Sequence, residues 1–147
     1  LFYKRNLDKF FRDRNWTTRE FQELFQEVDG DERKSLIEIG CGVGNFVWPL
    51  IKMGLKFNYY ACDFSPVALD IFKQHELYNE ELCQVFQADL SEPNGLVSKL
   101  PNADTRFHVA SLIFVLSAIH PDKMLNALKN VAEVRLDQLL YIVSFHS

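Results

Sequence analysis

Short apolar runs alternate along the chain with stretches in which apolar side chains recur at helical spacing. The runs are typical of strands buried on both faces, and the spaced pattern is typical of helices that bury one face. Strands are predicted over residues 35–39, 57–62, 83–88, 107–116 and 139–143. Helices are predicted over residues 46–53, 65–75 and 122–134. This alternation predicts an α/β domain with a mainly parallel sheet that is covered by helices on both faces.

The last predicted helix, residues 122–134, has an amphipathic pattern. Its larger apolar side chains fall on one face, which holds Met124, Leu125, Leu128 and Val131. A helix of a globular protein usually packs such a face against the core.

An aromatic and basic segment precedes the first predicted strand. Residues 1–21 contain six basic and three acidic side chains, a local charge of +3 in a chain whose total is −4. A threonine cap shortly before Glu20 indicates the start of a short helix. We therefore divide the chain into this N-terminal segment, residues 1–30, and a sheet domain, residues 31–147.

The composition excludes several classes of protein. Of the 147 residues, 48% are hydrophobic, which is enough to fill a core and excludes a disordered chain. No uncharged apolar run approaches the roughly 20 residues of a membrane-spanning helix. The first residues lead into charged sequence rather than into the apolar segment of a signal peptide. Because the chain begins with Leu1 and not with Met, we expect a fragment of a longer protein.

The cysteines bear on the cellular compartment. Cys41, Cys62 and Cys83 are an odd number without Cys-x-x-Cys spacing, so the sequence predicts neither a disulfide framework nor a zinc site. Their number favours a reducing compartment. We expect the cytoplasm, with the nucleus and the mitochondrion left open, and we expect no metal.

The strongest motif is the glycine-rich turn Glu-Ile-Gly-Cys-Gly-Val-Gly-Asn, which follows the first predicted strand. Glycines allow a sharp turn and let a ligand lie directly on the main chain. The Gly-x-Gly-x-Gly spacing of Gly40, Gly42 and Gly44 differs from the Gly-x-Gly-x-x-Gly of dinucleotide sites. S-adenosylmethionine has no phosphate and carries positive charge, which suits the adjacent Glu38. We therefore predict that these four residues bind S-adenosylmethionine; a purely structural turn is the alternative.

Two aspartates follow the next two predicted strands. Asp63 stands 21 positions after Gly42, where a carboxylate can accept both hydroxyl hydrogens of a ribose. Asp89 is placed to accept a hydrogen bond from the exocyclic amine of adenine, and Leu90 is placed to pack on the ring. Each aspartate alone could be a helix cap. Because the carboxyl ends of parallel strands meet at one edge, the three features together favour a ligand site.

Several sequence blocks resemble a known family. The glycine turn is similar to motif I of class I S-adenosylmethionine-dependent methyltransferases. More narrowly, four blocks resemble the tRNA 3-methylcytidine methyltransferases: Phe2-Tyr3-Lys4, residues 10–16 (FFRDRNW), residues 60–66 (YACDFSP) and residues 112–124 (LIFVLSAIHPDKM). The resemblance covers residues 1 to about 134. It implies a Rossmann-like class I methyltransferase sheet and a tRNA substrate.

The resemblance also implies roles for particular residues. The implied cofactor pocket is lined by Gly40, Asp63, Asp89, Leu90 and Ile113. The implied lid over it contains Tyr3, Arg14 and Trp16. The aromatic and basic N-terminal segment would then contact both cofactor and tRNA, because an unstacked anticodon-loop base needs stacking and phosphate contacts. An amphipathic helix with solvated charges is the alternative for this segment.

The implied reaction is in-line methyl transfer. A cytosine ring nitrogen attacks the methyl group of the sulfonium, and S-adenosylhomocysteine leaves. Because that nitrogen has an in-plane lone pair, no strong general base is needed, and the enzyme contributes positioning and charge complementarity. We assign no catalytic residue. His120 is a candidate acid or base, but a role at the entry of the following helix is more common for such a residue.

The chain departs from the family pattern after Val134. Where the family has Lys-Pro-Gly and then a strand ending in Arg-Asp-Tyr-Gly, this chain has Arg-Leu-Asp-Gln and a strand ending at residues 144–147 (SFHS). His108 stands where an aspartate is usual. We therefore expect a C-terminally truncated sheet and keep two alternatives to a tRNA methyltransferase: a non-catalytic module that binds cofactor or tRNA, and a small-molecule methyltransferase. An auxiliary protein or an aminoacyl-tRNA synthetase, as in some relatives, is a further possible partner.

Overall fold

The computed structural model describes residues 33–44, 46–113 and 119–143; for Ile113 and residues 135–143 it describes the main chain. The N-terminal segment, and with it the predicted lid residues Tyr3, Arg14 and Trp16, lies outside the described residues. The division of the chain at residue 30 therefore stays a prediction.

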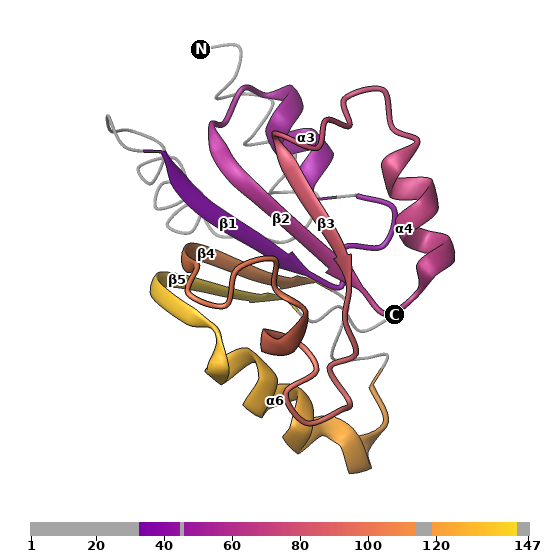
Figure 1. The fold of residues 1–147 in the computed structure, drawn as a ribbon, viewed down its shortest axis with the longest axis vertical. Helices are drawn as coiled ribbons and strands as arrows, with labels where there is room; N and C mark the ends of the chain where they lie inside the picture. The colour runs from indigo at the N-terminus through magenta and orange to yellow at the C-terminus, as the bar shows by residue number, and fades with distance from the viewer. Residues whose placement is uncertain (1–32, 45, 114–118, 144–147) are drawn as a thin grey trace.

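Strands and helices alternate along the described chain, as the sequence predicts (Figure 1). The strands are β1 (Lys34–Ile39), β2 (Phe57–Asp63), β3 (Cys83–Gln87), β4 (Arg106–Ile113) and β5 (Arg135–Val143). The helices are α3 (Val47–Lys52), α4 (Pro66–Lys73) and α6 (Met124–Glu133), with 3-10 turns η1 (Val97–Lys99) and η2 (Pro121–Lys123).

The described strands form one sheet in the order β3-β2-β1-β4-β5, and every pairing is parallel. In β1, Leu36 lies in register with Tyr59 of β2 and with Val109 of β4. Strands are added outward from β1 toward β3 on one side and from β4 toward β5 on the other. This reversal places a topological switch point between β1 and β4, where open α/β sheets bind their ligands.

Helices cover both faces of the sheet, which confirms the predicted α/β architecture. Figure 1 shows α3 and α4 on one side and α6 on the other. Successive residues of β1 point to opposite faces: Leu36 belongs to the core that includes Trp48 of α3 and Phe72 of α4, and Ile37 belongs to the core that includes Ala127 of α6. Both β1 side chains are fully buried, so the central strand is apolar on both faces.

The buried face of α6 differs from the predicted one. Leu125 and Leu128 are 63% and 48% exposed, whereas Ala127 and Asn130 are buried. The buried Asn130 bonds main-chain groups of the loop after β3: its Oδ1 accepts from Leu96 N at 3.1 Å, and its Nδ2 donates to Leu90 O at 2.8 Å. Val131 of the predicted face does pack against the core, so the apolar pattern predicted the helix and part of its buried face.

Two element boundaries also differ from prediction. The predicted helix 122–134 begins with the 3-10 turn η2, because His120 Nδ1 accepts a hydrogen bond from Asp122 N at 3.2 Å and caps that turn. Strand β5 begins at Arg135 rather than at residue 139, because it pairs with β4 from Arg106 onward. The polar residues at its start do not have a strand pattern, and pairing with a neighbouring strand overrides it. None of the described helices is both long and apolar enough to cross a membrane.

Replacing Phe72 tests the packing of α4. Phe72 is fully buried, and its ring lies 4.5 Å from that of Trp48 between centroids. Phe72→Ala should lower the free energy of unfolding in urea by about 3–5 kcal/mol through lost burial and a residual cavity. The matched control is Ile71→Ala on the same helix, 48% exposed, which should change it by less than about 0.5 kcal/mol. Equal losses would contradict this packing.

Candidate functional site

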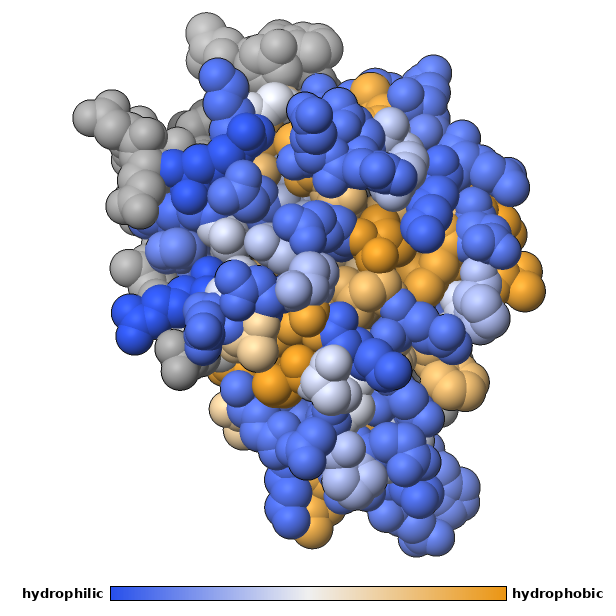
Figure 2. Space-filling model, in the orientation of Figure 1, coloured by the Kyte–Doolittle hydropathy of each residue, from blue (hydrophilic) through white to orange (hydrophobic). Residues whose placement is uncertain are grey.

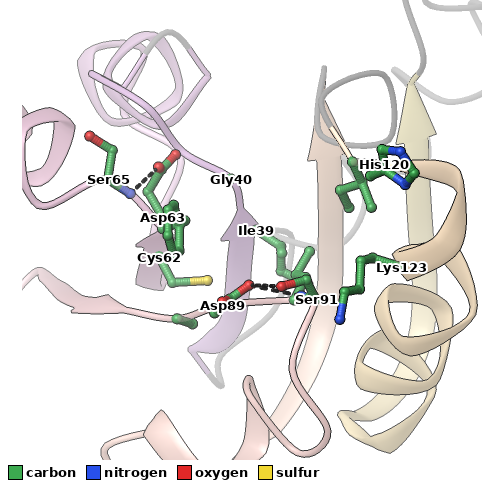
Figure 3. Close-up of a pocket in the computed structure, with 13 residues that line it drawn as sticks. Ile39, Gly40, Cys62, Asp63, Ser65, Asp89, Ser91, His120 and Lys123 are labelled. Atoms are coloured by element: carbon green, nitrogen blue, oxygen red, sulfur yellow. Dashed lines mark hydrogen bonds between the residues drawn. The ribbon is translucent and has the colours of Figure 1, made fainter.

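A cavity of about 610 Å³ opens where β1, β2 and β3 end (Figure 3). Its lining comes from four short segments: Ile39 and Gly40, residues 62–65, residues 88–91, and Ile119, His120 and Lys123. The predicted site residues Gly40, Asp63, Asp89 and Leu90 are among them. Strand ends that are far apart in the sequence therefore meet at one cavity, as the predicted parallel sheet requires.

The glycine turn has a backbone conformation that favours glycine. Gly40, Gly42 and Gly44 have φ values of 76°, 55° and 98°, in the left-handed region that side chains disfavour. The turn is tied to the neighbouring strand, because Gly40 N and Cys41 N both donate to Cys62 O at 2.8 Å.

The three glycines of this turn serve different purposes. Gly40 lines the cavity, whereas Gly42 and Gly44 do not belong to its lining. A Cβ on Gly44 would lie 2.1 Å from the ring of Trp48, so Gly44 lets α3 pack closely. Gly42 has open space around its Cα, and its N–H donates to Asp63 Oδ2 at 2.8 Å. Close packing on Trp48 therefore requires glycine at position 44, and ligand contact at Gly40 stays a prediction.

Asp63 joins the glycine turn to the start of α4. Its Oδ2 accepts from Gly42 N at 2.8 Å, and its Oδ1 accepts from Ser65 N at 2.9 Å. Ser65 in turn caps α4 by accepting from Ala68 N at 3.2 Å. A carboxylate has about four acceptor positions, so Asp63 can hold these two bonds and still accept two hydroxyl hydrogens from a ligand in the cavity.

Asp89 lines the cavity and makes its hydrogen bonds to Ser91 through one oxygen. Its Oδ1 accepts from Ser91 N at 2.9 Å and from Ser91 Oγ at 2.6 Å (Figure 3). Its Oδ2 has no hydrogen bond to any residue in the part of the chain that the structure describes. The adjacent Leu90 is buried and also lines the cavity. An acceptor and an apolar side chain thus stand side by side, as an adenine ring would require.

Two other predicted residues stand apart from the described lining. Glu38 is 3% exposed and is not in the lining; strand alternation places it with Leu36 on the face that α3 and α4 cover. Ile113 ends β4, in register with Val143 of β5. A contact of either side chain with a cofactor stays a prediction.

The cavity is also lined by residues that the sequence did not predict for the site. Phe64, directly after Asp63, lines it and is 65% exposed. With Val67 and Ile71 of α4 it forms an exposed apolar patch, and Figure 2 shows apolar surface reaching the edge where α4 lies. The position of Phe64 after a strand-end aspartate was the signal that could have identified it.

His120 and Lys123 line the side of the cavity opposite Asp63 (Figure 3). His120 caps η2 through Nδ1 and so takes the helix-entry role that the sequence favoured. Its Nδ1 also lies 3.6 Å from Asp122 Oδ2. Because both side chains are exposed, this pair contributes little to the stability of the fold. Lys123 brings a positive charge to a cavity whose other described side is acidic.

The three thiols are free and buried. Burial raises the pKa of Cys62 to about 12; the Gly40 main-chain hydrogen bond opposes this, and Asp63 and Glu38 add to it. Burial, assisted by the charge of Glu38, raises the pKa of Cys83 to about 12, and burial likewise raises the pKa of Cys41. Across the described residues, no three His, Cys, Asp or Glu side chains cluster as a metal site would require.

Fold and site together define a class of protein. A parallel sheet with a switch point, a glycine turn after β1 and acidic residues at the ends of β2 and β3 define a Rossmann-like domain with a cavity at its switch point. The family described as "Methyltransferase domain" matches residues 37–135. The chain therefore belongs to the methyltransferase-domain family, and its sheet is the Rossmann-like class I methyltransferase fold that the sequence predicts.

Comparison with curated proteins finds more specific relatives within this family. The chain is 52% identical over 136 residues to the mouse (Mus musculus) tRNA N(3)-cytidine methyltransferase METTL6, covering 91% of this chain and 47% of that protein. It is 44% identical over 135 residues to the tRNA N(3)-methylcytidine methyltransferase trm141 of Schizosaccharomyces pombe, covering 90% and 52%. The chain thus spans about half the length of these curated relatives.

A solved structure shows the same fold. The plantazolicin methyltransferase BpumL, solved in complex with SAH, superposes with a TM-score of 0.60 at 14% identity, covering 83% of this chain and 43% of that one.

Substituting Gly44 and Gly42 one at a time should distinguish the free-energy cost of a packing clash from the cost of backbone strain. Gly44→Ala should destabilise the protein by about 3 kcal/mol or more, because the new methyl group overlaps Trp48 and the left-handed conformation is strained. Gly42→Ala should cost only the strain, about 1–2 kcal/mol. Urea unfolding of both variants measures the difference. Equal losses would show that α3 does not pack on Gly44 as described.

The thiols should be inert in the folded protein. With its pKa raised to about 12, about one Cys62 thiol in ten thousand is ionised at pH 8. Because the thiolate is the reactive form, a disulfide reagent such as DTNB should label no cysteine of the native protein at pH 8 and all of them in urea. Raising the pH should increase native labelling. Labelling of the native protein at the unfolded rate would contradict the burial of these thiols.

Proposed function

We propose that this protein is an S-adenosylmethionine-dependent methyltransferase that forms 3-methylcytidine in the anticodon loop of tRNA. The observation that carries the proposal is the cavity at the switch point, where Gly40, Asp63, Asp89 and Leu90 converge. The names of the relatives with which the chain shares 52% and 44% identity support the substrate and the product. Because the chain spans about half of those relatives, its activity is tested below on the chain itself.

The residues of the cavity fit the adenosine part of this cofactor. A volume of about 610 Å³ lies in the range of small-molecule sites. Asp63 offers two acceptor positions to a ribose, Asp89 Oδ2 offers one to the exocyclic amine of adenine, and Leu90 and Phe64 supply apolar surface for the ring. Gly40 allows the remaining part of the ligand to approach the main chain.

The bound cofactor would supply an electrophilic methyl group on a sulfonium. The contribution of this chain is to bind and orient: Asp63 and Asp89 hold the nucleoside, and the acidic side of the cavity favours a positively charged ligand. The target base would have to enter as an exposed, unpaired nucleotide. Lys123, on the opposite side of the cavity, and the +3 charge of residues 1–21 support contact with a polyanionic RNA.

The site needs no base among the described residues. A cytosine ring nitrogen attacks through its own lone pair, so no proton has to be removed before the methyl group is transferred. His120 is held at the helix entry by its Nδ1 bond to Asp122 N, which supports a structural role for this residue. The buried, raised-pKa thiol of Cys62 is unsuited to act as a nucleophile even though it lines the cavity.

The compartment and further partners are part of the same proposal. Three free cysteines support a protein that works in a reducing compartment, and we propose the cytoplasm. An auxiliary protein or an aminoacyl-tRNA synthetase stays a prediction from the family resemblance.

The direct test incubates the protein with total tRNA and methyl-labelled S-adenosylmethionine, followed by nucleoside analysis. Label should appear as 3-methylcytidine. Asp63→Asn removes one of the two accepting oxygens and the charge, so it should weaken S-adenosylhomocysteine binding by about 10-fold to 100-fold. Asp70→Asn is the matched control, since Asp70 is an exposed aspartate of α4 outside the cavity, and it should leave affinity unchanged.

Other outcomes of this experiment identify the alternatives. Label only in protein or in small molecules would contradict the tRNA substrate. Calorimetric binding of S-adenosylhomocysteine without turnover would indicate a non-catalytic cofactor module. Unchanged affinity of the Asp63→Asn variant would show that Asp63 does not bind the ribose.

A further inference from the structure

Two asparagines of α6 hold the loop that carries Asp89 and Leu90. Asn126 and Asn130 lie one helical turn apart, so their side chains project from the same face. Asn126 Nδ2 donates to Ser91 O at 3.0 Å. Asn130 Nδ2 donates to Leu90 O at 2.8 Å, 40 residues away in the sequence.

Asn130 makes further hydrogen bonds to the same loop and to the main chain of its own helix. Its Nδ2 also donates to Glu92 O at 2.8 Å and to Asn126 O at 3.0 Å, and its Oδ1 accepts from Leu96 N at 3.1 Å. Asn130 is 1% exposed. Its amide therefore uses both donor and acceptor in a site without access to water, and loss of either would leave main-chain groups of the loop without partners.

The loop itself is folded tightly against Asp89. Glu92 N donates to Asp89 O at 3.3 Å, and Gly95 N donates to Glu92 O at 3.1 Å. A Cβ on Gly95 would lie 1.9 Å from Asp89 O. The main chain at Asp89 is thus in close contact with Gly95, and the carbonyls of the next three residues are held by the α6 asparagines. Small shifts of this loop would move the Asp89 carboxylate.

The same loop presents the groups that would recognise adenine. Asp89 Oδ1 is held by Ser91, which leaves Oδ2 for the cavity, and Leu90 lies beside it. The carbonyl oxygens of Leu90 and Ser91, which α6 holds, belong to these same residues. The position of Asp89 Oδ2 therefore depends on hydrogen bonds from Asn126 and Asn130 of α6. Neither asparagine lines the cavity.

We propose that Asn130, assisted by Asn126, is a positioning residue that sets the Asp89–Leu90 loop so that the site selects adenine by its exocyclic amino group. The inference rests on the proposed cofactor site. It extends that site to α6, although neither Asn126 nor Asn130 would contact the ligand directly.

The chemistry of the base supplies a direct readout. Asp89 Oδ2 accepts a hydrogen from the amino group of adenine, whereas hypoxanthine has a carbonyl oxygen at that position and would meet the carboxylate with repulsion. S-adenosylhomocysteine and S-inosylhomocysteine differ in this group. The ratio of their dissociation constants therefore measures how well Oδ2 is positioned. Both ligands bind the folded protein, so partial unfolding changes both constants equally and leaves the ratio unchanged.

The experiment measures both dissociation constants by calorimetry on the full chain. The native protein should prefer S-adenosylhomocysteine by about tenfold or more. Asn130→Asp has the same shape and keeps the acceptor for Leu96 N–H, but it places an oxygen against the carbonyls of Leu90 and Glu92. The preference should then fall below about threefold. Asn126→Ala, which removes one bond to Ser91 O, should reduce it partly and tests the inference if Asn130→Asp does not fold.

A further loop variant and two controls separate positioning from general destabilisation. Gly95→Ala disturbs the same loop through its contact with Asp89 O, so it should also lower the preference. Phe72→Ala destabilises the opposite face of the sheet, and Lys129→Ala changes an exposed residue of α6; both should retain the native ratio.

The possible outcomes distinguish failure of the inference from failure of the proposed function. If Asn130→Asp and Asn126→Ala bind both ligands with the native ratio, the inference is wrong while the proposed cofactor site stands. If the native protein binds both ligands equally, there is no amino-group selection for α6 to support, and the inference is again overturned. If the native protein binds neither ligand, the proposed function itself fails.

Discussion

The parallel pairing of β1 with both β2 and β4 is the constraint on which the site depends. Ile39, the last residue of β1, lies in register with Cys62 of β2 and with Leu112 of β4. Because the chain builds outward from this central strand in two directions, its connections diverge at the carboxyl ends of β1 and β4. The cavity lies at that divergence, and the glycine turn, Asp63 and the Asp89 loop all face it because their strands end there.

The aspartates Asp63 and Asp89 make local hydrogen bonds and still keep acceptor positions for the ligand proposed above. Asp63 bonds to the main chain of Gly42 and of Ser65, and Asp89 bonds twice to Ser91 through a single oxygen. A carboxylate has more acceptor positions than these bonds use. The local bonds hold each carboxylate in place before a ligand arrives, which reduces the entropy lost on binding. Neither aspartate is the N-cap of a described helix, since Ser65 caps α4; contact of each aspartate with a ligand stays a prediction.

Helix α6 shows where a pattern of apolar residues is misleading. Its two most apolar exposed positions, Leu125 and Leu128, point away from the core, and a polar residue, Asn130, is buried. The reason is the loop after β3, which has no strand partner for its carbonyl and N–H groups. Satisfying those groups is comparable in free energy to burying a leucine, since an unpaired buried polar group costs about 1–3 kcal/mol and a buried leucine contributes about 1.5–3 kcal/mol. The helix is therefore oriented by hydrogen bonds as well as by apolar burial.

The sequence by itself determined the kind and order of the elements, the glycine turn and the two strand-end aspartates, because these depend on local periodicity and on residues adjacent in the chain. Only the tertiary structure decided that Gly40 faces the cavity while Gly44 faces Trp48, and that Phe64 and Lys123 join the site. It alone showed the hydrogen bonds of Asn130 to the loop after β3, whose partner atoms lie 34 to 40 residues away in the sequence. Hydrogen bonds between distant segments leave no periodic pattern, so they are set by the packing of the folded chain.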